Sequence, residues 1–218
     1  MNTIRKLTRQ EVQADLDSLA KNYKTKDVDG LIRRYVKEGA DVSDLRGHIL
    51  TEQQFHRIYY YVSLKQLKNP GQRLRFITDN MFFSDWWHTD QLIKFVSDVD
   101  FDTAFACAEK CVYDEDTFIR RWGYVMFISK LCRSGENLPR IISLLHDDDE
   151  YYVQMAEAWL IAELAIFFPE DIYDYLKNDC TLKYSITGKA VQKILDSYRI
   201  SDEYKEKFKA LRPTLKTV

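Results

Sequence analysis

Two aromatic side chains and a nearby carboxylate are the first candidates for chemistry in this sequence. Residues 84–90 read Ser-Asp-Trp-Trp-His-Thr-Asp, and both Ser84 and Asp85 are residue types that commonly precede the first turn of a helix. The predicted helix continues through Leu92, Ile93 and Val96. On it Trp86 and Asp90 are four residues apart and share a face. The stretch therefore predicts an aromatic wall beside a negative charge.

The same residues also fit a structural role. Tryptophan side chains are usually buried, and a carboxylate in the first turns of a helix is favoured by the helix dipole. In that interpretation Trp86 and Trp87 anchor the core and Asp90 is a solvated charge. The spacing by itself leaves both interpretations open.

A second candidate is the pair Arg120 and Arg121. They interrupt a helix predicted over 116–132, whose apolar residues cover nearly the whole circumference, which is typical of an inner helix. Arginine keeps its charge, so near the interior it requires a carboxylate or phosphate partner. Alternatively, both side chains extend to solvent and pack only their stems.

The third candidate is the helix predicted over 151–168, which has two opposed apolar stripes. Such a helix is sandwiched between neighbours, and Trp159 and Glu163 share one of its faces. The acidic run 147–150 in front of it is interpreted as capping and dipole partners.

The elements that carry these residues are helices. Only 7 Gly and 4 Pro leave little turn chemistry for a β fold, and no stretch alternates apolar and polar residues convincingly. About a dozen helices with brief connections predict an all-α fold, a curved solenoid of antiparallel helix pairs (HEAT-like repeats), as one domain over 1–218. No repeat of about 34 to 47 residues is visible by identity.

Bulk charge does not indicate a nucleic-acid partner, because the net charge is −2, so any such binding needs a local basic surface. The four Cys lie far from any His cluster, which argues against a metal site. No apolar signal core and no uncharged run near the ~20 residues of a membrane span is present. We therefore expect a cytoplasmic protein without a membrane partner.

Three stretches, in this order, resemble the bacterial DNA alkylation repair family of HEAT-like-repeat DNA glycosylases. They are Trp86-x-x-x-Asp90, then residues 118–121 (Phe-Ile-Arg-Arg), then residues 151–163 (Tyr-Tyr-Val-Gln-x-Ala-x-x-Trp-Leu-x-x-Glu) with Pro169 behind them. The last stretch is the most specific. The resemblance spans about residues 64–198.

The resemblance implies roles for individual residues. Asp90 becomes the catalytic carboxylate and Arg121 its phosphate-side companion, while Trp86 and Trp159 form the aromatic walls of the cleft. Trp87 competes with Trp86 for that place, and Arg120 is counted among the DNA contacts. The implied activity is excision of cationic alkylated purines, 3-methyladenine and 7-methylguanine, from double-stranded DNA by a monomer that needs no cofactor and no metal.

A fixed carboxylate suits this chemistry because the transition state concentrates positive charge on the sugar. Indole faces add cation–π attraction of about 0.5–2 kcal/mol for a charged base. Asp90→Asn keeps the shape of the side chain, so from sequence we expect nearly unchanged stability and a loss of about 10²–10³-fold in base release.

At two places the sequence departs from the family's pattern in a way that should weaken DNA binding. Where the family usually has Trp-x-Leu-Arg-Glu, this chain has Trp159-Leu-Ile-Ala162-Glu163 and so lacks the Arg. Where the family has a later cluster of basic residues, this chain has Thr187-Gly188-Lys189, which is poorer in positive charge. Each lost phosphate contact lowers affinity and flattens its salt dependence, so we expect weak, salt-sensitive DNA binding. The alternative function is a catalytically silent HEAT-like module that binds DNA structures or a protein in its concave groove.

Overall fold

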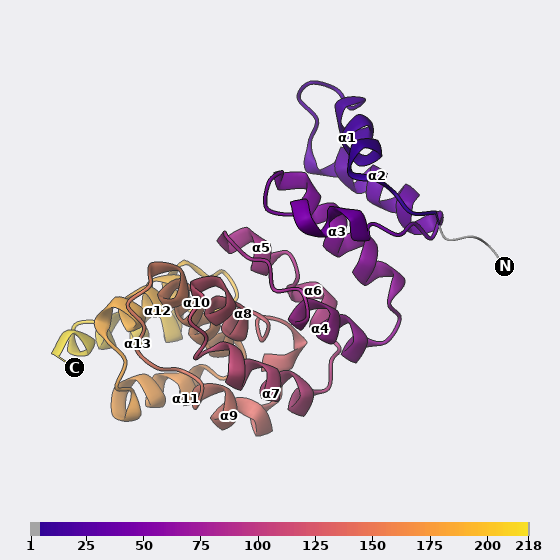
Figure 1. Cartoon of the computed structure of the whole chain (residues 1–218). Helices are drawn as coiled ribbons and strands as arrows, with labels where there is room; N and C mark the ends of the chain where they lie inside the picture. The colour runs from indigo at the N-terminus through magenta and orange to yellow at the C-terminus, as the bar shows by residue number, and fades with distance from the viewer. Residues whose placement is uncertain (1–4, 218) are drawn as a thin grey trace. The chain divides into compact units, whose positions relative to one another are not determined.

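Helices account for nearly all the regular structure of the chain (Figure 1). The computed structural model describes residues 5–217, and within them it has thirteen α-helices, several short 3-10 segments and one π-helical turn over Tyr175–Asp179. The β pairing among these residues is one isolated bridge between Lys6 and Asp41. The prediction of an all-α protein is confirmed.

The chain divides into two compact units, Met1–Ser84 and Asp85–Val218. Each unit is described by itself below. The expected single domain over 1–218 and its curved array of HEAT-like repeats stay predictions.

Within residues 5–84 the first unit has four α-helices, and local signals mark where they begin and end. Thr8 and Glu11 form a capping box, Gly39 follows the second helix with φ 63°, and Asn69 caps the helix that starts at Pro70. The second helix packs against the third. The four helices are α1 (Arg9–Asp17), α2 (Thr25–Lys37), α3 (Gln53–Gln66) and α4 (Pro70–Thr78).

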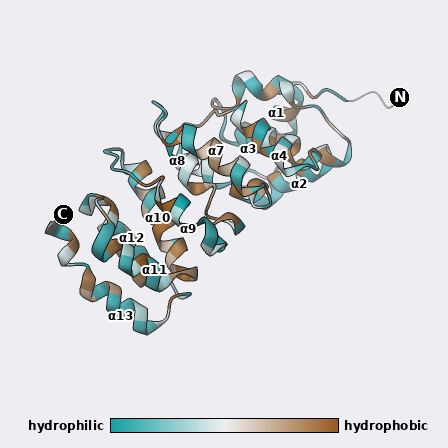
Figure 2. Ribbon diagram, turned by 90° about the horizontal axis from the view of Figure 1, so that it is seen from below, coloured by the Kyte–Doolittle hydropathy of each residue, from teal (hydrophilic) through white to brown (hydrophobic). Residues whose placement is uncertain are grey.

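The second unit is organised around its longest helix, α10 (Tyr151–Phe167). This helix packs against α8 (Thr117–Val125) on one side and against α12 (Tyr184–Asp196) on the other. Hydrophobic residues dominate it in the hydropathy view (Figure 2). Val153, Leu160 and Leu164 of one apolar stripe are buried in this packing, whereas Tyr152 and Trp159 of the other stripe are partly exposed. The remaining helices are α5 (Trp86–Asp90), α6 (Ile93–Val96), α7 (Phe101–Cys111), α9 (Leu138–Ile142), α11 (Pro169–Asp174) and α13 (Asp202–Leu211).

Two helices of this unit are shorter than the sequence predicted. The helix expected to run from Trp86 through Val96 is broken into α5 and α6, and the one expected over 116–132 ends at Val125. At both breaks backbone N–H groups donate to carbonyls three residues back, as in Leu92 to Thr89 and Ile128 to Val125. Such tight turns end an α-helix without any Gly or Pro to mark the position.

A glycine sets the distance between α7 and α8. A Cβ placed on Gly123 would lie 2.7 Å from Cγ1 of Val112 and 3.1 Å from Cβ of Cys111. Only glycine permits this approach, so Gly123 fixes the position of α8 and of Arg121 on it.

Glu157 of α10 is an ionisable group inside the core. Its side chain is 0% exposed, Oε1 accepts a hydrogen bond from the backbone N–H of His146 at 3.2 Å, and Oε2 has no partner among residues 5–217. Burial raises the pKa of Glu157 to about 8, with the nearby charge of Asp148 acting in the same direction. The folded protein therefore holds this carboxyl in its neutral form at pH 7.

We predict that Glu157→Gln stabilises the protein at neutral and alkaline pH. The unfolded chain releases this proton near pH 4.5 and the folded chain near pH 8, so stability falls as the pH rises between these values. Each unit of difference is worth about 1.4 kcal/mol, and the neutral amide removes the effect. Thermal unfolding of both proteins from pH 5 to pH 9 measures it. Parallel curves would contradict the assignment.

Candidate functional site

Asp90 and Arg121 form a two-pronged ion pair between α5 and α8. Nη2 of Arg121 lies 2.9 Å from Oδ1 and 3.0 Å from Oδ2 of Asp90, and its Nε donates to Oδ1 at 3.2 Å. A guanidinium fork that meets a carboxylate in this way fixes orientation as well as distance. The structure thus brings together the two residues that the sequence singled out for catalysis.

The rest of the guanidinium is also occupied. Nη1 of Arg121 donates to the backbone carbonyl of Tyr152 at 2.7 Å, and Nε lies 3.2 Å from the hydroxyl of Thr89. Arg121 is 4% exposed, so it does not extend to solvent. Its contacts tie α8 to α5 and to the start of α10. The predicted phosphate contact of Arg121 stays a prediction, since the described contacts all lead to protein groups.

Asp90 remains accessible from one side. Its side chain is 18% exposed, and α5 is started by Asp85, whose carboxylate accepts the backbone N–H of Trp86 at 2.7 Å. Burial raises the pKa of Asp90 above its ordinary value, and the charge and hydrogen bonds of Arg121 act against that rise. Asp90 is therefore a partly dehydrated carboxylate held in place by its neighbour.

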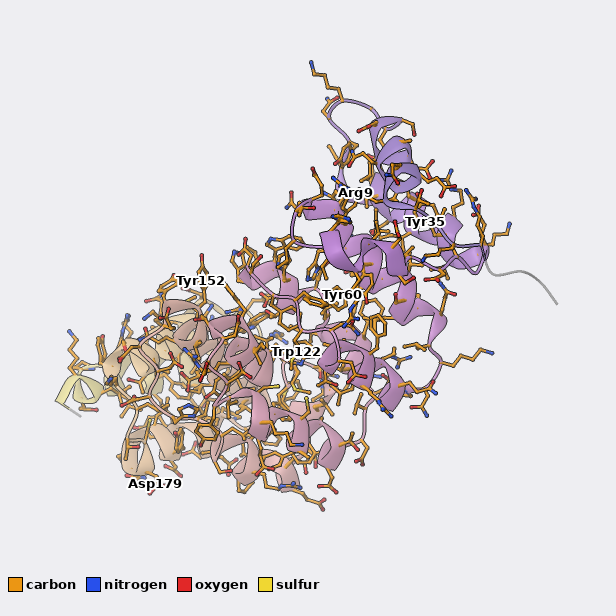
Figure 3. All side chains as sticks on the ribbon, viewed as in Figure 1. Arg9, Tyr35, Tyr60, Trp122, Tyr152 and Asp179 are labelled. Carbon is orange, nitrogen blue, oxygen red and sulfur yellow. The ribbon has the colours of Figure 1, made fainter. Side chains whose placement is uncertain are left out.

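The ion pair lies in a cleft of about 350 Å³, here called the first cleft. Trp86 and Trp159 line it together with Asp90 and Arg121, as the sequence analysis expected. Trp86 is 47% exposed, and Tyr152, labelled in Figure 3, also reaches the surface. Aromatic side chains and a single carboxylate therefore line the same cleft. The full lining is Trp86, Asp90, Arg121, Tyr151, Tyr152, Met155, Trp159 and Lys193.

Trp87 and Arg120 do not line the first cleft. The Trp87 ring packs against His88 at 4.0 Å between centroids, and burial lowers the pKa of His88 to about 4. Arg120 pairs with Asp148 at 2.6 Å and donates to the carbonyls of Asp114 and Glu115. Arg120 therefore anchors the acidic run to the start of α8. The DNA contacts predicted for both residues stay predictions.

A second cleft of about 360 Å³ adjoins the first and shares Trp159 and Lys193 with it. Ala162, where the resembling family has a cation, is part of its wall. Glu163 and Arg199 close another side as an ion pair, with Nη1 to Oε1 3.0 Å and Nη2 to Oε2 2.5 Å. The lining is Trp159, Ala162, Glu163, Ile166, Lys193, Asp196, Ser197, Tyr198 and Arg199.

Lys193 and the two tyrosines of the first cleft, Tyr151 and Tyr152, were not predicted as site residues from the sequence. Tyr152, Met155 and Trp159 follow helical spacing, so their common face was readable from the sequence. Lys193 enters from α12, and no local pattern marks which lysine of that helix approaches Asp90. Thr187 is buried, and Lys189 donates to Oε1 of Gln154 at 2.9 Å.

Neither a metal centre nor a membrane span is found among residues 5–217. No group of three or more His, Cys, Asp or Glu side chains in that range is placed to hold a metal ion. Cys107 and Cys111 have sulfurs 3.9 Å apart on one face of α7 without a further ligand type beside them. No described helix is both long and apolar enough to cross a bilayer.

Comparison with known proteins places the chain in a family. A family model described as DNA alkylation repair enzyme matches residues 19–194, which include Asp90, Arg121, Trp159 and Lys193. Searches of curated proteins and of solved structures gave no match. Since the family model covers most of the sequence, the chain belongs to the DNA alkylation repair enzyme family.

Proposed function

We propose that the chain is a DNA N-glycosylase that releases cationic alkylated purines, such as 3-methyladenine and 7-methylguanine, from double-stranded DNA. The observation that carries the proposal is the Asp90–Arg121 pair, which presents one oriented carboxylate to an aromatic cleft. Membership of a DNA alkylation repair family supports DNA as the substrate. We include in the proposal that the helices form a HEAT-like solenoid and that the protein acts as a cytoplasmic monomer.

The chemistry follows from where positive charge lies along the reaction. The alkylated base is already cationic, so when the bond to the sugar breaks, the bonding electrons neutralise the base and the positive charge moves to the sugar. The carboxylate of Asp90 stabilises that charge in a partly dehydrated cleft and accepts a proton from the water that adds to the anomeric carbon. Trp86 and Trp159 attract the charged base through their ring faces.

Arg121 acts in this proposal as a positioning residue. Its fork fixes both oxygens of Asp90 and keeps the pKa of that carboxyl below the value that burial alone would give. The pairing also links the stability of the fold to the site, because a buried Arg121 without its counter-charge is unfavourable.

We predict that Asp90→Asn lowers release of 7-methylguanine from methylated DNA by about 10²–10³-fold, because the amide cannot stabilise the charged sugar. The variant should also lose stability, by up to about 3–5 kcal/mol, since Arg121 is left without a partner. This corrects the expectation of unchanged stability. Rates are compared well below the unfolding temperature, with Asp102→Asn on the exposed start of α7 as the control. Equal rates would assign Asp90 a structural role only.

We predict that Arg121→Lys shifts the acid limb of the pH profile to higher pH. An ammonium cannot grip both oxygens of Asp90, so the pKa of that carboxyl, already raised by burial, rises further. Activity requires the carboxylate and is lost as the pH falls through this pKa. The measurement is the rate of base release per folded molecule between pH 4.5 and 8. A purely structural role would lower the rate equally at every pH.

We predict that the wild-type protein binds DNA weakly, with a slope of about −2 to −4 when log affinity is plotted against log salt concentration. For Ala162→Arg we expect this slope to be steeper by about one, because the variant adds one phosphate contact. The new guanidinium has room in the second cleft beside Trp159. Binding of an undamaged fluorescent duplex over a KCl series measures both. If the wild-type protein binds tightly and salt leaves the affinity unchanged, the non-catalytic module becomes the better proposal.

A further inference from the structure

The charges of the first cleft do not cancel. Its lining holds one carboxylate, Asp90, and two cations, Arg121 and Lys193. Asp90 and Arg121 neutralise each other through the two-pronged pair. Lys193 therefore supplies the one uncompensated charge of the cleft.

Arg121 is poorly placed to meet an external anion. All three of its nitrogens donate to Asp90, Thr89 or the carbonyl of Tyr152, and its side chain is almost fully buried. A phosphate on Arg121 would have to displace Asp90, the group that the proposed reaction needs. A second cation must then hold the nucleic-acid backbone near this site.

Lys193 has the properties that such a cation needs. It is half-buried and forms no hydrogen bond or ion pair with any residue between 5 and 217. Burial lowers its pKa, the positive charge of Arg121 acts in the same direction, and Asp196 and Asp90 oppose the shift. A partly buried ammonium without a hydrogen-bond partner gains from an incoming anion that accepts its hydrogen bonds.

Two of the three acids around Lys193 are paired with arginines. Asp90 pairs with Arg121 and Glu163 pairs with Arg199. Asp196 accepts a hydrogen bond from the neutral amide of Gln192 at 2.9 Å, keeps its charge, and lines the second cleft but not the first. Lys189, one turn earlier on α12, is held by Gln154 and by the carbonyl of Ser185. Lys193 is thus the lysine of this helix that is free to turn toward a ligand.

The position of Lys193 also relates it to the missing cation at Ala162. Both residues line the second cleft next to Trp159, one from α12 and the other from α10. We propose that Lys193 is a phosphodiester-binding residue that holds the DNA backbone between the two clefts and takes the place of the cation absent at Ala162. This inference rests on the proposed function for its ligand, but its test does not depend on catalysis.

The test measures the salt dependence of binding to an undamaged fluorescent duplex. Losing one phosphate contact flattens the slope of log affinity against log salt by about 0.9, so Lys193→Gln should show this change and bind several-fold more weakly at low salt. Lys193→Arg should retain the wild-type slope. Lys110→Gln, at an exposed position of α7, removes the same charge away from both clefts and should also retain the wild-type slope.

Ala162→Arg combined with Lys193→Gln tests the replacement itself. If both positions serve the same stretch of backbone, the double variant recovers the wild-type slope, since one cation leaves and one enters. Circular dichroism confirms that each variant is folded.

The outcomes separate this inference from the proposed activity. An unchanged slope in Lys193→Gln, or an equal change in Lys110→Gln, overturns the assignment even if the protein releases methylated bases. A flattened slope confined to Lys193→Gln supports it even if no base is released, and it would then describe a DNA-binding module. If wild-type protein binds no duplex at low salt, the inference is wrong.

Discussion

The buried pair between Asp90 and Arg121 is the interaction on which the second unit and its first cleft both depend. It joins α5 to α8, and the same guanidinium reaches the carbonyl of Tyr152 at the start of α10. Three helices therefore converge on one side chain. Such a pair adds little net stability when compared with well-packed apolar residues, but removing one partner is costly. The main effect of the Asp90–Arg121 pair is therefore to fix the relative positions of α5, α8 and α10.

The packing of the helices around the pair also determines where the other residues of the first cleft lie. Gly123 lets α7 approach α8, and α10 is held between α8 and α12. These contacts set where Trp159 stands relative to Asp90. A helix as short as α5 would not hold a carboxylate in place by itself, because a helix of that length is marginally stable without tertiary contacts. The orientation of Asp90 thus comes from the fold around it.

Sequence reasoning identified the all-α fold, the inner position of α10 and the meeting of Trp86, Asp90, Arg121 and Trp159. Those features rest on local signals, namely caps, apolar periodicity and a spaced motif. It extended α8 to residue 132 and joined α5 to α6, since the tight turns that end them have no marker residue. It overlooked Lys193, and its expectation for Asp90→Asn left out the buried pairing with Arg121. Both depend on contacts between residues more than thirty positions apart along the chain.

Under the proposed function, cations near Asp90 have two opposite effects. Each cation close to the carboxylate weakens the stabilisation that it gives to a developing sugar cation. Phosphate binding, by contrast, improves with every added cation. The two requirements conflict within one cleft. In the proposed function the buried pair of Arg121 and the accessible Lys193 separate the two requirements, since Arg121 would orient Asp90 and Lys193 would hold the DNA backbone. Weak, salt-sensitive binding is the expected consequence of that division.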